Sequence, residues 1–425
     1  MDNIDNIAYL ALLSMLFFSI ISQSEIMGGL ALIFSFLIIF KKIIKENFSF
    51  GFENYKKAVF VYFLLVTLSL AASTLFKLSL HGYIKTCIYV LFFFCACDFF
   101  KFNKNKIIPT ILFVTFLMSY ESLIAIFQNS IGVNEISGWQ DMSNINPEEI
   151  ISRSYGTLKP YNPNLLAGYL LCGLGSFIFA MLYFLNKQKK RISLVFGILF
   201  LINIIAIMDT GSRGAYIGFI LFFLCLFSAL IYYIHKKTGG LSKIKKRYKN
   251  ITLVSIIGIL YFIITDPALT RRFESIFAFR ADSSISFRFN VYEAVWRMFL
   301  DNPFLGIGVG NQNFREIYGL YMKTGFDALG SYCVFLEIAV ESGIFALLAF
   351  VLFLYFVIKT CIKIGFYDFD KTNKILALST ILMILAVMGH GLFDTIWFRP
   401  QVQLLFWTNI AMLDGLNIKL CKINK

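Results

Sequence analysis

Long apolar runs alternate with short polar connections along almost the whole chain of 425 residues. A helix needs about 20 residues to cross roughly 30 Å of hydrocarbon, so each long run predicts a transmembrane helix. The pattern predicts twelve spans, at 7–21, 26–40, 58–76, 84–100, 107–129, 164–185, 192–209, 213–234, 251–265, 335–358, 375–394 and 401–417. We therefore expect an all-α polytopic membrane protein in which residues 1–425 form a single membrane domain.

One late segment, residues 266–334, interrupts this alternation. It holds six of the eleven arginines and the glycine-rich turn Gly306–Gly310. Irregular polar backbone is not tolerated against lipid, so the segment must lie outside the bilayer or line a cavity within the protein. We interpret it as a large extracytoplasmic loop that bears short helices and closes over a substrate site.

Residues 283–300 of this loop carry apolar side chains at helical spacing. Phe287, Val291, Ala294, Val295 and Phe299 predict one buried stripe on a helix. Such a helix either lies on the bilayer surface or directs Arg288 toward the interior of the protein. The pattern leaves both arrangements open. The glycine-rich turn has no Rossmann strand and helix around it, so it predicts close approach of backbones rather than a dinucleotide site.

Charge sets the expected orientation. The formal charge of +14 is distributed in short basic clusters between apolar runs, with 26 of the 39 basic residues on one side of the predicted topology. Positive charge collects on the cytoplasmic side, so both termini are expected there, with no nucleic-acid partner. The first apolar run lacks the features of a cleaved secretory signal, so we interpret it as a retained helix.

The two predicted sides differ in the kind of basic residue they carry. Of the 26 basic residues on the cytoplasmic side, only Arg191 and Arg247 are arginines, whereas nine of the 13 on the other side are arginines. Topology needs charge but does not distinguish the two residues. The arginine fork binds phosphate or carboxylate with two parallel hydrogen bonds. The outer side therefore predicts an anion-binding face, unless the arginines pair with acids of their own loop.

Polar breaks outside the long loop add further candidates. Residues 130–163 include Arg153, and the short turn from Asp209 to Arg213 lies between two spans. Asp209 is a possible local partner for Arg213. An arginine at the membrane edge either extends toward water or marks a functional site. Cysteines lie mostly within apolar runs and the three histidines are far apart, so we predict no disulfide framework, metal or cofactor.

Three motifs together resemble the O-antigen ligase and polymerase superfamily of membrane glycosyltransferases. They are Thr210-Gly-Ser-Arg213-Gly-Ala, Arg288 followed by Asn302-Pro-Phe-Leu-Gly-Ile-Gly-Val-Gly, and Leu336-Glu-Ile-Ala-Val-Glu-Ser-Gly-Ile. Two stretches are more similar to a cyanobacterial branch once proposed to transport inorganic carbon. These are Ser331-Tyr-Cys-Val-Phe-Leu-Glu and His390-Gly-Leu-Phe-Asp394-Thr-Ile-Trp-Phe-Arg399-Pro-Gln.

The resemblance implies a metal-independent enzyme in the bacterial inner (plasma) membrane. Its partners would be a polyprenyl-diphosphate-linked glycan donor, a lipid or glycan acceptor, and membrane lipids. Arg213 and Arg288 match the family's two functional arginines and would bind the donor diphosphate. We add Arg153 and Arg399 as further candidates because both lie on the same predicted side.

The chain departs from the family at the expected catalytic histidine, whose place is taken by Tyr332 and is followed by Cys333. With an ordinary pKa near 10, tyrosine is a poor base at neutral pH. The candidates to accept the proton are Glu337, Glu341, His390 and Asp394, and we favour Glu337 because it lies near the outer end of its helix. Glu337 and Glu341 are four residues apart, on one helical face.

A bicarbonate transporter, or a membrane protein associated with bicarbonate uptake, is the alternative function. The outer arginines would then attract bicarbonate, and a path with alternating access would be required. Such paths are often built from inverted repeats with paired broken helices. The sequence shows no internal repeat and no such pair, which favours the glycosyltransferase.

Overall fold

The computed structural model describes residues 2–21, 24–45, 53–132, 153–238 and 283–416, and these are helical with no strands. Ten helices in the described residues are long and apolar enough to cross a membrane. They are α1 (Asp2–Ile21), α2 (Ser24–Ile44), α3 (Asn54–Ala72), α4 (Phe76–Phe102), α5 (Ile107–Ser130), α6 (Pro163–Asn186), α7 (Lys190–Asp209), α8 (Arg213–Thr238), α13 (Val334–Tyr367) and α14 (Lys371–His390). Each matches a predicted span, so the protein is a polytopic all-α membrane protein.

The predicted spans at 251–265 and 401–417 remain. The first lies outside the described residues. The second is a helix of only 12 residues, α15 (Pro400–Ala411), followed by the 3-10 turn η7 (Met412–Gly415). At 1.5 Å per residue, α15 is about 18 Å long, too short to cross the bilayer. Its polar residues Gln401, Gln403 and Thr408 are buried in the bundle.

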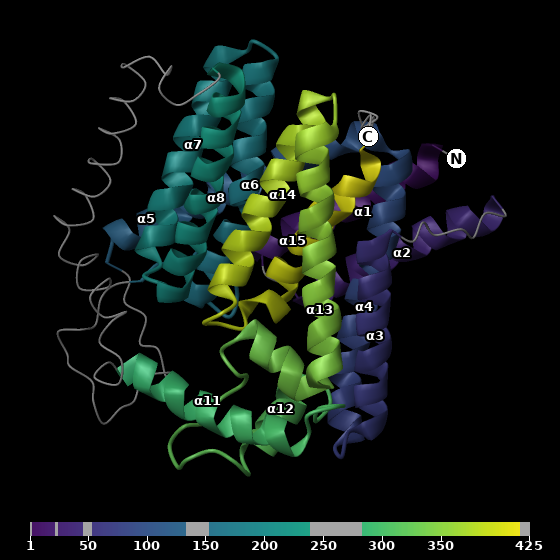
Figure 1. Ribbon diagram of the computed structural model, residues 1–425, viewed down its shortest axis with the longest axis vertical. Helices are drawn as coiled ribbons and strands as arrows, with labels where there is room; N and C mark the ends of the chain where they lie inside the picture. The colour runs from purple at the N-terminus through teal and green to yellow at the C-terminus, as the bar shows by residue number, and fades with distance from the viewer. Residues whose placement is uncertain (1, 22–23, 46–52, 133–152, 239–282, 417–425) are drawn as a thin grey trace.

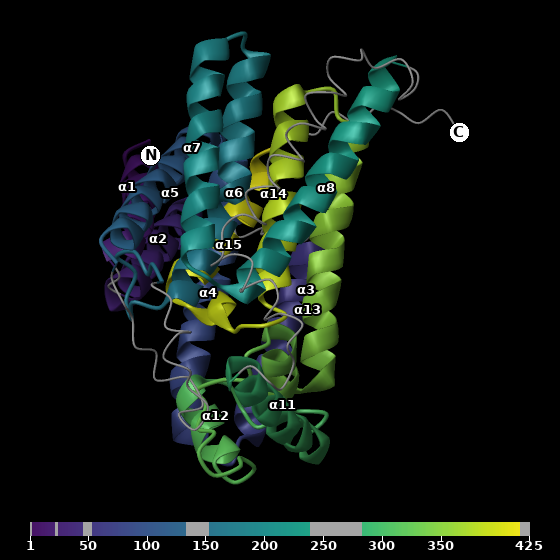
Figure 2. The ribbon, with the colours of Figure 1, turned by 90° about the vertical axis from the view of Figure 1, so that its left-hand side faces the viewer.

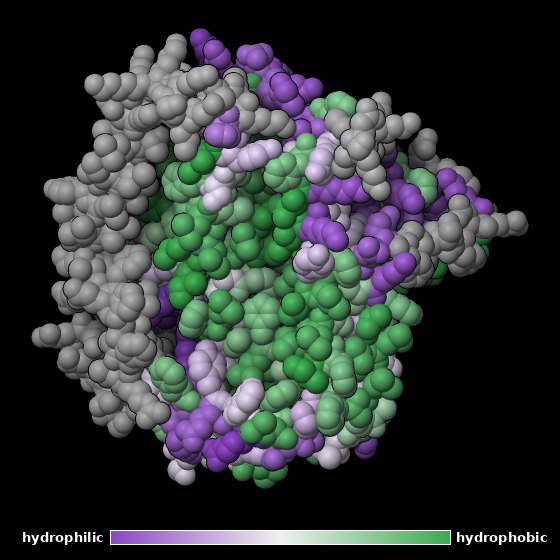
Figure 3. Space-filling model, viewed as in Figure 1, coloured by the Kyte–Doolittle hydropathy of each residue, from purple (hydrophilic) through white to green (hydrophobic). Residues whose placement is uncertain are grey.

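The surface of the bundle is apolar around its middle. Figure 3 shows a broad hydrophobic area across the face in view, with hydrophilic residues gathered toward the two ends. Many large apolar side chains of the spans are exposed, among them Phe116, Leu194 and Leu224. Exposed apolar area of this extent is expected where lipid covers the protein, because lipid replaces water as the solvent of these side chains.

Helix α6 lies inside the bundle, between α5, α7 and α14 (Figures 1 and 2). Small residues permit this close packing: a Cβ on Gly175 would lie 2.4 Å from the backbone oxygen of Ser379 in α14. Glycine at such crossings lets helix backbones approach and gain van der Waals contact. Because α6 is fixed on several sides, its first turn is a rigid platform for the residues described below.

Two helices lie across one end of the bundle instead of along it (Figure 1). These are α11 (Ser283–Asp301) and α12 (Asn311–Tyr318), and they form a small second core with the start of α13. All five residues of the predicted stripe, from Phe287 to Phe299, are buried in the protein. The stripe therefore packs on protein rather than on the bilayer surface, which settles the alternative that the sequence left open.

The glycine-rich turn fastens these helices to the bundle. Helix α13 is broken at Gly343, where φ is 82° and a Cβ would lie 1.9 Å from the backbone oxygen of Phe304. Beside the break, the N–H of Gly308 donates to the backbone oxygen of Glu341 at 2.9 Å, and the N–H of Gly310 donates to its carboxylate at 2.8 Å. Close backbone approach, as predicted, thus explains the glycines, and Glu341 anchors the turn.

Candidate active site

Asp394 lies at the centre of a polar cluster beneath α11. It belongs to the connection between α14 and α15 and is buried. One carboxylate oxygen accepts a hydrogen bond from the side-chain amide of Asn164 at 2.8 Å and lies 3.8 Å from a guanidinium nitrogen of Arg288. The other oxygen accepts the N–H of Thr395 at 2.8 Å. We call Arg153, Asn164, Arg288 and Asp394 the Asp394 cluster.

Asn164 connects Asp394 to Arg153. Its side-chain oxygen accepts a hydrogen bond from Arg153 Nη2 at 2.9 Å, while Arg153 Nε donates to the backbone oxygen of Thr210, also at 2.9 Å. Asn164 lies in the first turn of α6, where Asn162 caps the helix and Pro163 occupies the first position. The start of α6 and the end of α7 are therefore joined through one guanidinium.

Arg153 is held in place by a segment that α5 fixes from behind. The carboxylate of Glu121 in α5 accepts the N–H of Thr157 at 3.1 Å. The side-chain oxygen of Gln128 accepts the N–H groups of Tyr155 and Gly156 at 3.1 and 2.8 Å. The sequence reasoning missed this support, although a glutamate inside an apolar span was a signal for it.

Arg288 reaches the cluster from α11. Its guanidinium carbon lies 5.6 Å from the ring centre of Tyr332, within the range of a cation–π interaction, and its side chain is 20% exposed. The hydroxyl of Tyr292, one turn further along α11, donates to the backbone oxygen of Tyr332 at 3.1 Å. Arg288 is thus directed into the protein, as the second of the two predicted arrangements requires.

Tyr332 supports Arg288 and is unsuited to accept a proton. Its backbone has φ of 55°, a left-handed conformation that is costly for a bulky residue and persists only where its surroundings hold it. Phe287 contacts its ring edge-on. Burial, and then the nearby carboxylate of Asp394, raises the pKa of Tyr332 well above its usual value. The phenol therefore stays protonated at neutral pH, in agreement with the sequence argument.

Glu337 lies in the first turn of α13 and is buried. Its carboxylate accepts the N–H of Ser331, and a Cβ on Gly330 would lie 3.0 Å from one of its oxygens. Among the described residues, no hydrogen bond or ion pair links Glu337 to the Asp394 cluster. Its observed contacts hold the turn that carries Tyr332.

His390, the last residue of α14, is buried between α6 and α8. A Cβ on Gly168 would lie 3.4 Å from its Nδ1, and one on Gly214 would lie 2.7 Å from its Cδ2. Its Nε2 is 3.4 Å from the hydroxyl of Ser212. Its Nδ1 has no hydrogen-bond partner in the part of the chain that the structure describes. His390 thus packs under the turn that precedes Arg213.

Arg213 and Arg399, the other two predicted diphosphate ligands, occupy different positions relative to the Asp394 cluster. Arg213 begins α8, half-buried, in the same turn whose Thr210 oxygen binds Arg153. Arg399 is exposed before α15, and no hydrogen bond or ion pair places its side chain in the Asp394 cluster within the described ranges. Arg315 pairs with Asp327, and Arg297 donates to the backbone oxygen of Tyr321. The local contacts of Arg315 and Arg297 therefore account for these two arginines without a substrate. Three more, Arg271, Arg272 and Arg280, lie outside the described residues.

Helix ends add to the positive potential of this region. The N-terminal parts of α6 and α8 contact His390 at the end of α14, and the N–H of Val334, the first residue of α13, donates to Gly391 beside it. A helix N-terminus carries the positive end of the backbone dipole. Within the described chain, no three His, Cys, Asp or Glu side chains are grouped to hold a metal ion. Arg288 lies beside Asp394, Arg153 reaches it through Asn164, and Arg213 begins α8 in the turn that binds Arg153, which is an arrangement suited to a bound anion.

Comparison with known protein families indicates the class to which this site belongs. Residues 198–351 match the family model described as O-antigen ligase. The matched segment contains Arg213, Arg288, Tyr332 and Glu337, whereas Arg153, Asn164 and Asp394 lie outside it. The match supports the O-antigen ligase superfamily, and with it a membrane glycosyltransferase, as the class of protein. No curated protein matches the chain.

Proposed function

We propose that the protein transfers a glycan from a polyprenyl-diphosphate donor to a hydroxyl of a lipid or glycan acceptor, at the extracytoplasmic face of the bacterial inner membrane. One observation carries this proposal most directly: Arg288 of α11 lies beside Asp394, and Arg153 reaches the same carboxylate through Asn164. The motif match at residues 198–351 supports the same class of reaction.

The reaction needs two functions that these side chains supply. The acceptor oxygen attacks the anomeric carbon of the donor sugar, and the bond between that carbon and the phosphate oxygen breaks. The bonding electrons stay on the leaving diphosphate, where Arg288 and Arg213 stabilise the growing negative charge. The hydroxyl proton must pass to a base within hydrogen-bond reach of the acceptor.

Of the predicted bases, Asp394 has the geometry that suits this step. It contacts Arg288, so a diphosphate held by that arginine would place the sugar close to its carboxylate. Tyr332 is held in the protonated form, and the known contacts of Glu337 and His390 are with Ser331 and Ser212. We assign the role of general base to Asp394, with Glu337 as the competing assignment.

The bicarbonate transporter is the alternative. A broken helix does occur, at Gly343 of α13, but the other described helices have no such non-helical interior residue. The break is also occupied, because the backbone of Phe304 and Leu305 packs against it. The paired broken helices that line many transport paths are therefore not seen in the described part of the protein.

A deletion strain distinguishes the two functions. We expect its surface glycans to lose length or their attachment to the acceptor, and its uptake of labelled bicarbonate to remain normal. Wild-type protein should restore the glycans and the Arg288→Lys variant should not. Normal glycans with impaired bicarbonate uptake would refute the glycosyltransferase.

The orientation needs its own test. Lys189 and Thr324 are both exposed, and they lie on opposite sides of the predicted topology. In a background without native cysteines, an impermeant thiol reagent applied to intact spheroplasts should label the Thr324→Cys protein and spare the Lys189→Cys protein. The reverse pattern would place the Asp394 cluster on the cytoplasmic side.

A further inference from the structure

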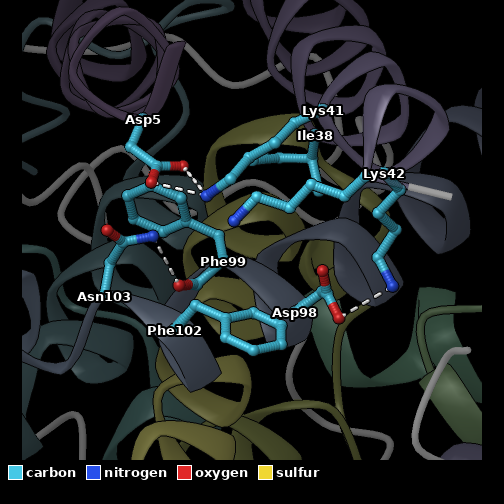
Figure 4. A pocket seen from close by; sticks show the side chains of 9 residues that line it. Asp5, Ile38, Lys41, Lys42, Asp98, Phe99, Phe102 and Asn103 are labelled. Atoms are coloured by element: carbon cyan, nitrogen blue, oxygen red, sulfur yellow. Dashed lines mark hydrogen bonds and ion pairs between the residues drawn. The ribbon is translucent and has the colours of Figure 1, made fainter. Parts of the chain in front are cut away.

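A second polar site lies at the other end of the bundle, where α1 begins and α2 and α4 end. It is a pocket of about 140 Å³ (Figure 4). About 10–15 Å³ of such volume accommodates one water molecule, so the pocket has room for a larger polar group. The charged residues that line it are Asp5, Lys41, Lys42, Lys45 and Asp98.

Two ion pairs build the walls of the pocket. Lys41 Nζ lies 2.5 Å from both carboxylate oxygens of Asp5, and Lys42 Nζ lies 3.0 Å from Asp98. Figure 4 shows these pairs on different sides of the pocket, with the rings of Phe99 and Phe102 also lining it. The pairs fix two ammonium groups in the walls of the pocket.

The lining carries a net positive charge, with three lysines against two aspartates. Lysine at the last turn of α2 also offsets the negative end of that helix dipole, which is a purely structural role. Lys45 lies just beyond the helix and is exposed. The helix dipole does not account for Lys45, which adds an exposed positive charge to the pocket lining.

Apolar side chains surround the lysines. Phe102, which lines the pocket, is 65% exposed, and Phe40, Ile43 and Ile44 are exposed beside the lysines of α2. Both α1 and α2 belong to the edge of the bundle (Figure 1). Water disfavours this mixture, whereas the boundary between headgroups and hydrocarbon suits it. A free phosphate ion would use the lysines but would gain nothing from the phenylalanine.

We propose that this pocket binds the phosphate headgroup of an anionic phospholipid, with the acyl chains lying against the exposed apolar residues of α2 and Phe102. Basic pockets between transmembrane helices are suited to such headgroups. The proposal is independent of glycosyl transfer, because the pocket lies at the opposite end of the bundle from the Asp394 cluster.

The test measures lipid binding to purified full-length protein in detergent, by native mass spectrometry and by the shift in melting temperature. The probes are phosphatidylglycerol, phosphatidylcholine and inorganic phosphate at matched ionic strength. We expect phosphatidylglycerol to bind and to raise the melting temperature, with little effect from the other two. Lys45→Gln should weaken phosphatidylglycerol binding about fivefold, since each basic residue near the surface contributes attraction of that order.

Lys57→Gln is the matched control, because Lys57 is exposed in the first turn of α3 and does not line the pocket. It should keep wild-type lipid binding. Equal losses in both variants would show diffuse attraction to charge and overturn the pocket. An equal effect of inorganic phosphate would overturn the lipid as ligand, as would equal binding of phosphatidylcholine or no binding at all.

Discussion

The two ends of the bundle use charge in different ways. At the end that carries the lysines, charged groups pair directly: Lys41 with Asp5, Lys42 with Asp98, and Lys56 with Asp414. At the end that carries the arginines, exposed residues such as Arg315 and Asp327 also pair directly, but the Asp394 cluster differs. The nearest carboxylate oxygen of Asp394 and guanidinium nitrogen of Arg288 are 3.8 Å apart, and Asp394 reaches Arg153 only through Asn164.

This difference separates structural charge from charge that is available to a substrate. A buried ion pair in direct contact has already offset its desolvation, and removing one partner leaves a costly lone charge. The looser arrangement around Asp394 keeps the Arg288 guanidinium oriented and partly exposed, at 3.8 Å from the carboxylate. The arginine end therefore suits the binding of a mobile anion, whereas the direct pairs at the lysine end hold helices together.

The largest effect on activity is expected from Asp394→Asn. The amide keeps the shape of the carboxylate but accepts no proton, so turnover should fall by about 10²–10⁴, the usual contribution of a general base. Donor binding should persist. Glu337→Gln, measured in parallel, should affect melting temperature more than turnover. Loss of turnover in Glu337→Gln, with Asp394→Asn still active, would move the base to Glu337.

At the lysine end, Lys56→Met should change stability instead of activity. Lys56 and Asp414 have side chains that are 4% and 3% exposed, and the variant leaves the aspartate buried without its ammonium partner. A loss of about 3–5 kcal/mol in the free energy of unfolding is expected, and Lys56→Met combined with Asp414→Leu should recover most of it. If the folded Lys56→Met protein also lost turnover, the separation of the two ends would be wrong.

The smallest effect is expected from Tyr332→Phe. Because its pKa is raised by burial and by Asp394, the phenol stays neutral as pH rises through the range in which an ordinary tyrosine ionises. The variant should keep turnover within about tenfold of wild type and leave the alkaline side of the pH–rate profile unchanged. A lost or shifted alkaline limb would show that Tyr332 does ionise during the reaction.

Periodicity in the sequence predicted the helices well because lipid fixes their length and forces backbone hydrogen bonds inside each segment. The buried stripe from Phe287 to Phe299 was also predicted correctly, from its helical spacing. The prediction of a transmembrane span at 401–417 was wrong. Helix α15 is enclosed by protein, so its apolar residues do not need the length that crossing the lipid requires.

The site was predicted only in part. Arg288 was named from the family resemblance, and Arg153 and Asp394 from their residue type and position; the structure brings the three together. Asn164 and Gln128 were missed, because an amide bridge between segments far apart in the chain leaves no local pattern. The structure also distinguishes Arg288 from Arg315: both lie in the same loop, and only the fold shows that Arg315 pairs with Asp327.

Binding of undecaprenyl diphosphate to the purified protein in nanodiscs tests the central claim that the arginine end grips a diphosphate by the geometry of its guanidinium groups. Arg288→Lys keeps the charge and loses the fork, so the dissociation constant should rise by about 10- to 100-fold, as expected for the loss of one hydrogen bond between charged groups. Lys189→Arg, a change at an exposed lysine on the other predicted side, should leave binding unchanged. Equal affinity in the wild type and both variants would contradict the account.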